Sequence, residues 1–514
     1  MKKVLAIILA ALMLLGALSA CAKSETEQPQ QPEAPAANEP AEQPAEQPAE
    51  QPAADDNTAE IPTITYTNMS KEAKPNDDKV AAALSEYTSE KYGFNVRFQR
   101  TSNEQMALRF AETSGDIDDV ITLQNTYFDF ARTGALLDIT EYVENSDVIK
   151  QNVPQELLDA LYVDGKLYGI PTVKEMATGC GVVVRKADVE KYGWDLSKVK
   201  GWADLEPLLQ DIVDDPDTDI TIPFSGNWGV PLGDYQNVNY IVRPQSPWVT
   251  ILDGENNYKV ANVLETEYGK EFVTMMYDWK VKGFIPDNAY GSDWNTIYSN
   301  ALANGTVGII QWTGMPCGVQ TAMEWYPNEG ELVEVLFGDP VLTTYNLQVS
   351  VGAINAKTKN PDAAFRFLEM INSDTTARDF IDYGIENENY IRNADGRIEL
   401  TDTDSYSRES WQVANVLIPT LRASEPADKV ELYQAFNAKA QPALTYGFMP
   451  DFTAVDAENA AVNAVWKTYS EALYSGTANP ADTLDMVIQE MKTAGSDKIV
   501  AEIQAQLDAW LANK

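Results

Sequence analysis

The chain has 514 residues, a formal net charge of −40 at pH 7, three cysteines and no histidine. So acidic a chain repels phosphate backbones and polyanionic sugars, which argues against nucleic acid as a partner. The lack of histidine removes the usual general base, the Ser-His-Asp triad and histidine-rich metal sites, so we expect no catalytic residues, no cofactor and no metal ion.

The first residues have the pattern of a signal peptide. Two lysines precede an apolar run over residues 4–18, which is shorter than the roughly 20 residues that a membrane-spanning helix needs. The phrase "LSAC", which ends at Cys21, resembles the lipobox of bacterial lipoproteins. The resemblance implies cleavage after residues 1–20 and lipidation of Cys21; the alternative is an ordinary cleavage site with an incidental cysteine.

The segment that follows is predicted to be a tether. Residues 22–60 hold ten acidic residues against Lys23 alone, and "AEQP" occurs three times in succession over residues 41–52. Such a segment buries too little to offset its ordering entropy, so we expect residues 21–60 to be disordered or semi-extended. At roughly 3.1 Å per residue it could hold a folded domain up to about 120 Å from a lipid surface.

The folded part opens with alternating strand and helix patterns. Residues 61–67 alternate as a strand, a helix then ends at Gly93, and residues 94–98 alternate as a second strand. Another helix near residues 104–114 leads into a third strand, "DVITLQ". This order predicts an α/β lobe with a doubly wound sheet.

Ligands of such sheets bind beyond the carboxyl ends of the strands. Asn68 follows the first strand, and Asn125 and Tyr127 follow the third. These three are candidate ligand contacts, although each is equally suited to a helix cap or a turn.

Later segments continue the alternation. Residues 181–185 and "GTVGIIQW", which ends at Trp312, are predicted strands, and Leu347, Val349 and Val351 alternate as another. Pro361 opens a helix with one apolar face. The C-terminal stripe of Val500, Ile503, Leu507, Trp510 and Leu511 predicts a docked helix.

At "DGKLYGIP", residues 164–171, the chain resembles the family 1 extracellular solute-binding proteins of ABC importers. "VVVRKADVEKYGWD", "GWADLEPLL" and "VGAINAKTKNPDAAFRFL" fit the same pattern. From "NPDAAFRFLEMINSD" to "AGSDKIVAEIQAQLDAW" the chain is similar to a domain of unknown function found in a lipoprotein subgroup of that family. Asn387 and Asn389 depart from the glycine and histidine that relatives in the subgroup tend to carry, which leaves the role of their loop open.

The resemblance implies an α/β fold of the two-lobed periplasmic-binding-protein type II class, with hinged, discontinuous lobes and C-terminal helices. We expect one lobe over residues 61–178 plus 347–410, and the other over residues 179–346 plus 411–514. It further implies a monomer, lipid-anchored on the extracytoplasmic side of the cell membrane, that closes on a ligand and presents it to a permease driven by cytoplasmic ATPases.

A sugar site needs flat aromatic platforms with polar partners, and all eleven tryptophans follow residue 190. Trp228 and Trp294 lie in glycine- or asparagine-rich turns, and the resemblance implies that Trp312 stacks on the ligand; core packing is the alternative for each. The remaining candidate contacts are polar or amphipathic, namely Glu175, Tyr345 and Gln348.

The leading hypothesis is therefore capture of a carbohydrate, a neutral oligosaccharide, for import. A lipid-anchored glycoside hydrolase needs only two carboxylates and is the first alternative. The same fold binding a polyamine or peptide is the second.

Two smaller questions stay open. Cys180 and Cys317 could pair or remain buried thiols. The acidic run "DDPDTD", residues 214–219, hints at calcium, but the glycine and the final acidic position of an EF-hand are missing, which favours a solvated loop.

Overall fold

The computed structural model describes residues 61–69, 72–102, 105–106, 109, 117–226, 239–240, 246–252, 258–287, 289 and 293–513. All of them belong to one compact unit, Glu60–Lys514. The predicted signal peptide, Cys21, the predicted tether and Trp228 lie outside the described residues. Within the described ranges, no helix is both long and apolar enough to cross a bilayer.

The first sheet contains the predicted β-α-β unit. Its strand order is β2-β1-β3-β13-β4; β1 is parallel to β2 and β3, whereas β13 is antiparallel to β3 and β4. Six consecutive residues of β1 are buried, as expected for a strand that is covered on both faces. The strands are β1 (Thr63–Met69), β2 (Asn95–Thr101), β3 (Val120–Leu123), β4 (Gly169–Pro171) and β13 (Val351–Ile354).

One predicted strand is partly wrong. The alternation that includes Leu347 predicted a strand, but Thr344–Gln348 form helix α13 and the strand β13 begins only at Val351. The reason is a capping box at Thr343: its side chain accepts the backbone N–H of Asn346, and the Asn346 side chain accepts the backbone N–H of Thr343.

A second sheet has the order β11-β5-β10-β6 and a third the order β7-β8-β9. In the second sheet, β10 is antiparallel to β5 and parallel to β6. Two short pairs, β12 with β16 and β14 with β15, complete the strands. Their bounds are β5 (Gly181–Arg185), β6 (Ile222–Ser225), β7 (Asn239–Tyr240), β8 (Val249–Leu252), β9 (Lys259–Asn262), β10 (Val307–Trp312), β11 (Leu332–Leu336), β12 (Val341–Leu342), β14 (Tyr390–Arg392), β15 (Ile398–Leu400) and β16 (Gln441–Pro442).

Helix ends follow the predicted signals. Gly93 ends α2 with φ 74°, and Pro361 opens α14 as its first residue. The helices are α2 (Asp77–Tyr92), α4 (Tyr127–Arg132), α5 (Thr140–Asn145), α6 (Asp147–Asn152), α7 (Gln155–Asp159), α8 (Lys186–Tyr192), α9 (Glu206–Asp214), α10 (Glu267–Val281), α11 (Trp294–Asn304), α12 (Val319–Trp325), α13, α14 (Pro361–Ile371), α15 (Thr375–Tyr383), α16 (Lys429–Lys439), α17 (Asp456–Tyr474), α18 (Pro480–Ala494) and α19 (Ser496–Ala512).

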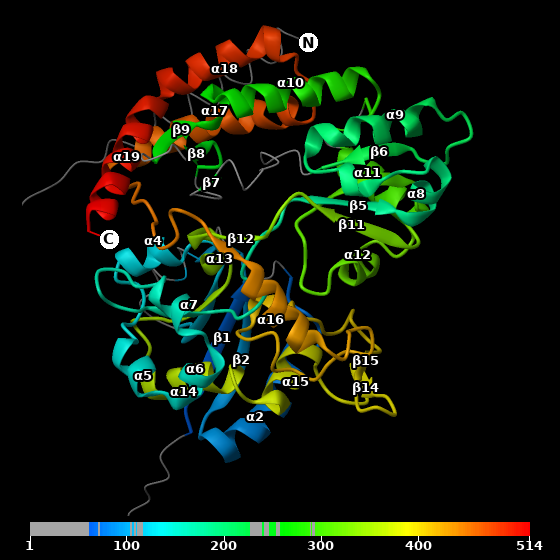
Figure 1. The fold of residues 1–514 in the computed structure, drawn as a ribbon. Coiled ribbons are helices and arrows are strands. Elements are labelled where there is room, and N and C mark those ends of the chain that lie inside the picture. Colours follow the sequence, from blue (N-terminus) through cyan, green and yellow to red (C-terminus); the bar gives the residue numbers. More distant parts are fainter. Residues whose placement is uncertain are drawn as a thin grey trace, which may run out of the picture. The chain divides into compact units, whose positions relative to one another are not determined.

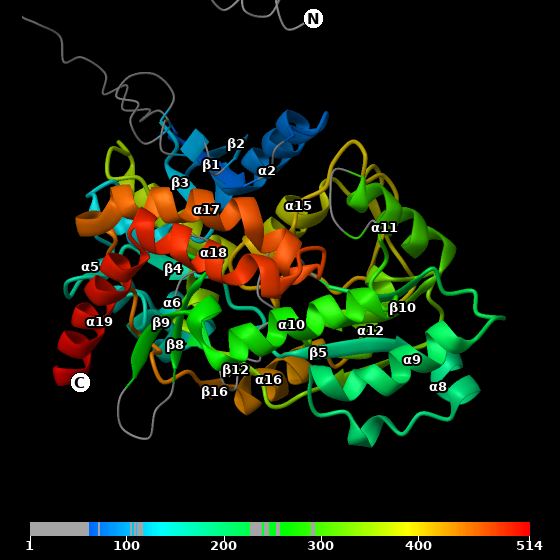
Figure 2. The same cartoon turned by 90° about the horizontal axis from the view of Figure 1, so that it is seen from above.

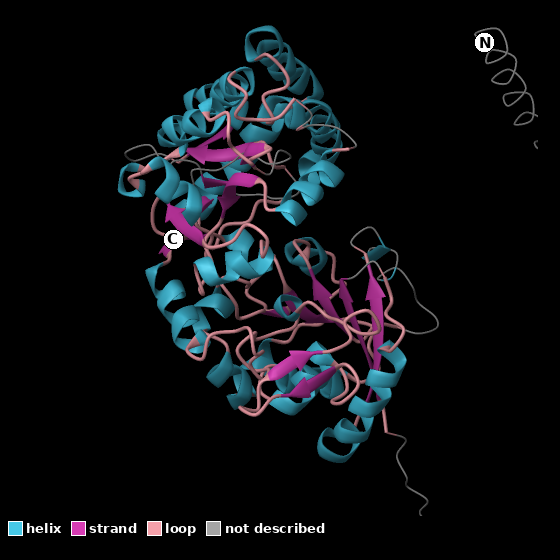
Figure 3. Cartoon of the chain, turned by 90° about the vertical axis from the view of Figure 1, so that its right-hand side faces the viewer, coloured by secondary structure: helices cyan, strands magenta, loops and turns pink. Residues whose placement is uncertain are grey.

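The buried apolar residues form separate cores around the sheets. The first core draws on residues 64–176 and 347–414 and surrounds the first sheet. The second draws on residues 182–335 and 448–507, so the C-terminal helices pack with the middle of the chain. Figures 1 and 2 show α17 and α18 side by side, in contact with α10. Figure 3 shows the strands in separate groups with helices around them.

Candidate functional site

A pocket of about 620 Å³ lies between the end of α15 with the loop after β15 on one side and the loop after β10 with α12 on the other. We call residues 382–383, which end α15, and the loop residues 403–411 its first wall; α15 packs in the first core. Residues 313–325, which comprise the loop after β10 and α12, form the second wall. The side between them is lined by the segment after β4, by α16 and by the segment that precedes α16, through Lys174, Glu175, Arg422, Glu425, Lys429 and Tyr433.

Within the part of the chain that the structure describes, two tryptophans line this pocket, one on each wall. Trp325 ends α12 and is 54% exposed, while Trp411 is half-buried in a 3₁₀ turn of the first wall. The Trp325 ring meets the ring of Trp312 edge-on, with centroids 5.3 Å apart. Such flat faces can pack against the apolar faces of a ligand ring.

Trp312 itself is 2% exposed and is not among the residues that line this pocket. Its indole N–H donates to Glu334 Oε1 at 2.6 Å, and burial raises the pKa of that carboxyl. Trp312 therefore supports Trp325 from beneath.

Charged side chains around the pocket are mostly paired. Lys174 Nζ lies 2.5 Å from Glu175 Oε1, and Lys429 Nζ lies 2.8 Å from Glu425 Oε1. Burial alone would raise the pKa of Glu425, but Lys429 lowers it below the ordinary value. Arg422 spans the pocket edge, 3.5 Å from Glu324 on α12. These pairs leave the pocket polar without a strong excess of one charge.

Asn68 is buried and holds another side chain rather than lining this pocket. Its Oδ1 accepts a hydrogen bond from Arg408 Nη1, and its Nδ2 donates to Gln412 Oε1 at 3.3 Å. The Arg408 guanidinium lies 4.4 Å from the centroid of the Phe98 ring and lines the first wall. Asn68 lines an adjacent cavity of about 320 Å³.

Two other predicted contacts, Asn125 and Tyr127, lie in the turn and helix after β3. The Asn125 backbone has φ 58° and its N–H donates to the carbonyl oxygen of Gln348 at 2.8 Å. The Tyr127 hydroxyl donates to the Leu161 carbonyl at 2.8 Å and accepts from the Tyr168 N–H at 3.1 Å. Burial raises the Tyr127 pKa. Neither residue lines the pocket.

Of the other predicted contacts, some line the pocket and others do not. Glu175 lines the pocket, whereas Trp294, Tyr345 and Gln348 do not. Trp294 begins α11 and stacks on Tyr298 with centroids 5.7 Å apart. Tyr345 is half-buried and Gln348 buried, both on α13.

Sequence reasoning missed Trp325, Trp411, Arg408 and Tyr433. It searched the ends of strands, whereas Trp325 ends a helix and Trp411 lies in a polar loop. The one available signal was an aromatic residue surrounded by polar ones, as in "SRESWQ" around Trp411.

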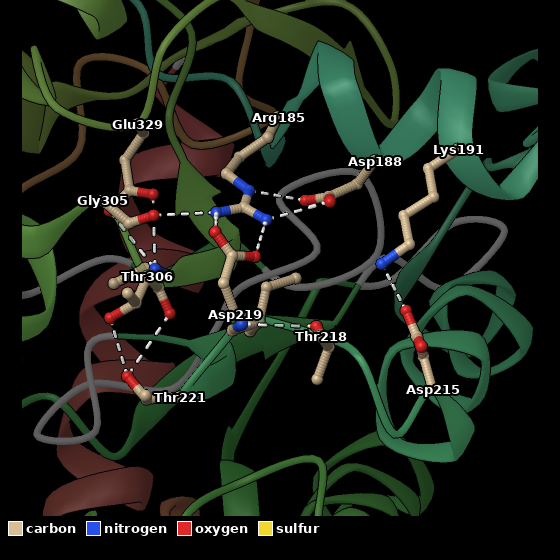
Figure 4. A network of polar contacts seen from close by, with 12 residues as sticks. Arg185, Asp188, Lys191, Asp215, Thr218, Asp219, Thr221, Gly305, Thr306 and Glu329 are labelled. Carbon is tan, nitrogen blue, oxygen red and sulfur yellow. Dashed lines mark hydrogen bonds and ion pairs between the residues drawn. The ribbon is translucent and has the colours of Figure 1, made fainter.

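The structure places two features that the sequence left open, the acidic run and the two cysteines. Figure 4 shows Asp215 bound to Lys191 and Asp219 bound to Arg185, the latter at 2.8 Å. Among the described residues, no group of three or more acidic or cysteine side chains could hold a metal ion. No disulfide joins Cys180 to Cys317, and both are half-buried.

Asn389 gives the divergent loop a structural role. It is 1% exposed; its Oδ1 accepts from the Ile385 N–H at 3.0 Å, and its Nδ2 donates to Ser405 Oγ at 3.1 Å. The loop is thereby fixed to the first wall of the pocket.

Comparison with known proteins gives the fold and the family. Residues 72–378 match the family described as bacterial extracellular solute-binding protein, and residues 444–512 match a domain of unknown function (DUF3502). A carbohydrate ABC transporter substrate-binding protein of Streptococcus pneumoniae serotype 4 (strain ATCC BAA-334 / TIGR4) is 24% identical over 453 residues, which cover 86% of this chain and 90% of that protein.

Solved structures agree on the fold. The N-glycan transport solute binding protein (NgtS) from Streptococcus pneumoniae has a TM-score of 0.76 at 21% identity, covering 88% of this chain and 99% of that one. Its complex with Man5GlcNAc has a TM-score of 0.67 at 23% identity, with the same coverage. The predicted two-lobed α/β fold is confirmed. Because the family match spans more than half of the chain, this protein belongs to the bacterial extracellular solute-binding protein family.

Proposed function

We propose that this protein captures an oligosaccharide in the pocket between its two walls and delivers it to the permease of an ABC importer. The observation that carries the proposal is a tryptophan on each wall, Trp325 and Trp411, beside paired charged groups. Sugar rings present apolar C–H faces and a rim of hydroxyl groups, which match indole faces and charged hydrogen-bonding partners respectively. The similar proteins from Streptococcus pneumoniae are named for carbohydrate and N-glycan transport.

The ligand is proposed to be neutral. Among the described residues, the pocket lining contains five carboxylate side chains and four cationic ones, and the chain carries a net charge of −40. The acidic protein would repel an anionic ligand electrostatically, whereas a neutral ligand would not be repelled. Glu175 is the predicted contact that lines the pocket; Trp228, Trp294, Trp312, Tyr345 and Gln348, with Asn68, Asn125 and Tyr127, stay predictions.

Binding is proposed to work by a population shift between open and closed arrangements of two hinged lobes, predicted over residues 61–178 plus 347–410 and residues 179–346 plus 411–514. Because the first core reaches Ala414, Trp411 is counted here with the first lobe. A ligand that contacts both walls stabilises the closed arrangement, because only there does it make both sets of contacts. Catalysis is not part of this proposal.

A lipid on Cys21 would hold the monomer at the outer face of the cell membrane, with residues 22–60 as the tether. Incorporation of radiolabelled palmitate into the full chain tests this part. The label should be lost in Cys21→Ala, and label that persists in that variant would contradict lipidation at Cys21.

The experiment for capture is a thermal-shift panel on the purified protein, with neutral oligosaccharides that include Man5GlcNAc, acidic oligosaccharides and a polyamine. At least one neutral glycan should raise the melting temperature, with little dependence on salt, and mass spectrometry should recover it intact. Cleaved glycan would indicate a hydrolase, and salt-sensitive stabilisation by the polyamine alone would indicate a cation binder; either result contradicts the proposal.

A further inference from the structure

Asn437, on α16, holds the backbone on both sides of Glu175. Its side-chain Oδ1 accepts the backbone N–H of Met176 at 3.0 Å, and its Nδ2 donates to the carbonyl oxygen of Lys174 at 2.9 Å. One amide thus satisfies the donor and the acceptor that flank Glu175, as a neighbouring strand would.

The segment so held connects two sheets. It runs from β4 of the first sheet to β5 of the second, and near its ends the backbone is fixed elsewhere: Val416 N–H donates to the Val173 carbonyl at 3.0 Å, and Thr178 exchanges two hydrogen bonds with Val341, at 2.9 and 3.0 Å. Between these points, the amide of Asn437 binds the backbone at Lys174 and Met176, and Lys174 Nζ also donates to the Glu175 carbonyl oxygen at 3.3 Å.

The same face of α16 reaches the pocket. Lys429, Tyr433 and Asn437 are spaced four residues apart, so they lie along one face of the helix. Lys429 and Tyr433 line the pocket, and Lys429 is anchored by Glu425 and by the Val416 carbonyl at 3.2 Å. Burial, together with the nearby charge of Glu175, raises the pKa of Tyr433. The helix therefore connects the pocket lining to the two hydrogen bonds that Asn437 makes with the backbone of Lys174 and Met176, which we call the backbone clamp.

We propose that Asn437 is a positioning residue for ligand binding, which fixes the backbone of Lys174–Met176 so that the Glu175 carboxylate is held in the pocket. This rests on the proposed function, because it takes Glu175 as a ligand contact. The Glu175 side chain is 18% exposed and is held at its other end by Lys174 at 2.5 Å. With both the backbone and the carboxylate fixed, the ligand meets a group that is already in place, and less ordering is required on binding.

The test begins without ligand. Amide hydrogen exchange in the full-length protein should show faster exchange at Met176 in Asn437→Ala, because that N–H loses its acceptor. Gln434→Ala is the matched control, since Gln434 is an exposed amide on the same helix. Unchanged protection of Met176 in Asn437→Ala would overturn the clamp, whether or not any glycan binds.

The second part measures the affinity for Man5GlcNAc in a double-mutant cycle of Asn437→Ala and Glu175→Gln. Asn437→Ala should weaken binding by about tenfold in the wild-type background and have little further effect in Glu175→Gln. Equal losses in both backgrounds would show a general structural role and overturn the inference. If the wild type binds no glycan of the panel, the proposed function fails, and with it the role of the clamp in binding, whatever Met176 shows.

Discussion

The two walls of the pocket hold their side chains in opposite ways. On and behind the first wall, Arg378 and Asp382 are fully buried and paired at 2.9 Å, and Arg408 is 8% exposed with Asn68 as a partner. On the second wall, Trp325 is 54% exposed and rests on another ring. The comparison teaches that the buried polar groups on and behind the first wall are engaged within the protein, whereas the aromatic that ends α12 remains available to a ligand.

The physical reason is desolvation. A polar or charged side chain that is buried at the end of a strand must find a protein partner, because an unsatisfied group costs a few kcal/mol. An indole that rests on a buried neighbour can keep one face exposed at little cost, since exposed apolar area is common on proteins.

The largest expected effect concerns a buried carboxyl beside the second sheet, between α12 and β11, that does not line the pocket. Glu329 is 4% exposed, its two oxygens accept the Val307 N–H at 3.3 Å each, and burial raises its pKa to about 7. In the unfolded chain it ionises near pH 4.5. Its contribution to stability is therefore complete below pH 4.5 and lost as the pH rises through 7, by about 3 kcal/mol.

Glu329→Gln removes this titration. Urea unfolding from pH 4.5 to 8 should show the stability of the wild type falling relative to the variant. Glu331→Gln is the matched control: exposed Glu331 pairs with Lys186, its pKa is lowered, and any trend should have the opposite sign. A pH-independent difference between the wild type and Glu329→Gln would contradict the raised pKa.

The next effect tests whether the first wall depends on hydrogen bonds within the protein. Asn68→Ala leaves Nη1 of buried Arg408 without its acceptor and should lower the free energy of unfolding by about 2 kcal/mol. Asn68→Asp is the control, since it keeps an acceptor of the same size and should retain most of the stability. Denaturant unfolding measures both, and a loss below about 0.5 kcal/mol in Asn68→Ala would show that the first wall does not depend on this bond.

Trp325→Ala tests whether the exposed tryptophan of the second wall contacts the ligand. Affinity for a stabilising glycan should fall by about tenfold, while the free energy of unfolding changes by less than about 1 kcal/mol, because the side chain is half-exposed. Trp194→Ala, a half-buried tryptophan that does not line the pocket, is the matched control and should leave affinity unchanged. Calorimetric titration gives both affinities, and equal values for wild type and Trp325→Ala would remove Trp325 from the site.

The smallest effect concerns the contact between α12 and the segment that precedes α16. Arg422 and Glu324 are 3.5 Å apart, and both side chains are about a third exposed. A double-mutant cycle of Glu324→Gln and Arg422→Gln on glycan affinity should give a coupling below about 1 kcal/mol. A coupling above about 2 kcal/mol would contradict the small contribution expected of a partly exposed ion pair.

Sequence pattern predicted the fold better than it predicted the site. The β-α-β unit and the helix opened by Pro361 follow from periodicity and local capping, which act over a few residues. The strand predicted from Leu347 to Val351 was partly wrong, because a capping box at Thr343 makes residues 344–348 helical and the strand begins only at Val351. For the site, what decides that Trp325 lines the pocket and Tyr127 does not is the set of residues around each ring, such as Leu161 beside Tyr127, which lie far away in the chain.

Hydrogen exchange with and without a stabilising glycan tests the central claim most directly. If the glycan lies between the two walls, amide exchange should slow together in peptides from residues 313–325 and residues 403–411. The peptide that contains Glu175 should also be protected, because Glu175 lines the side of the pocket between the walls. Protection confined to one wall, or to segments outside the pocket, would contradict capture between them.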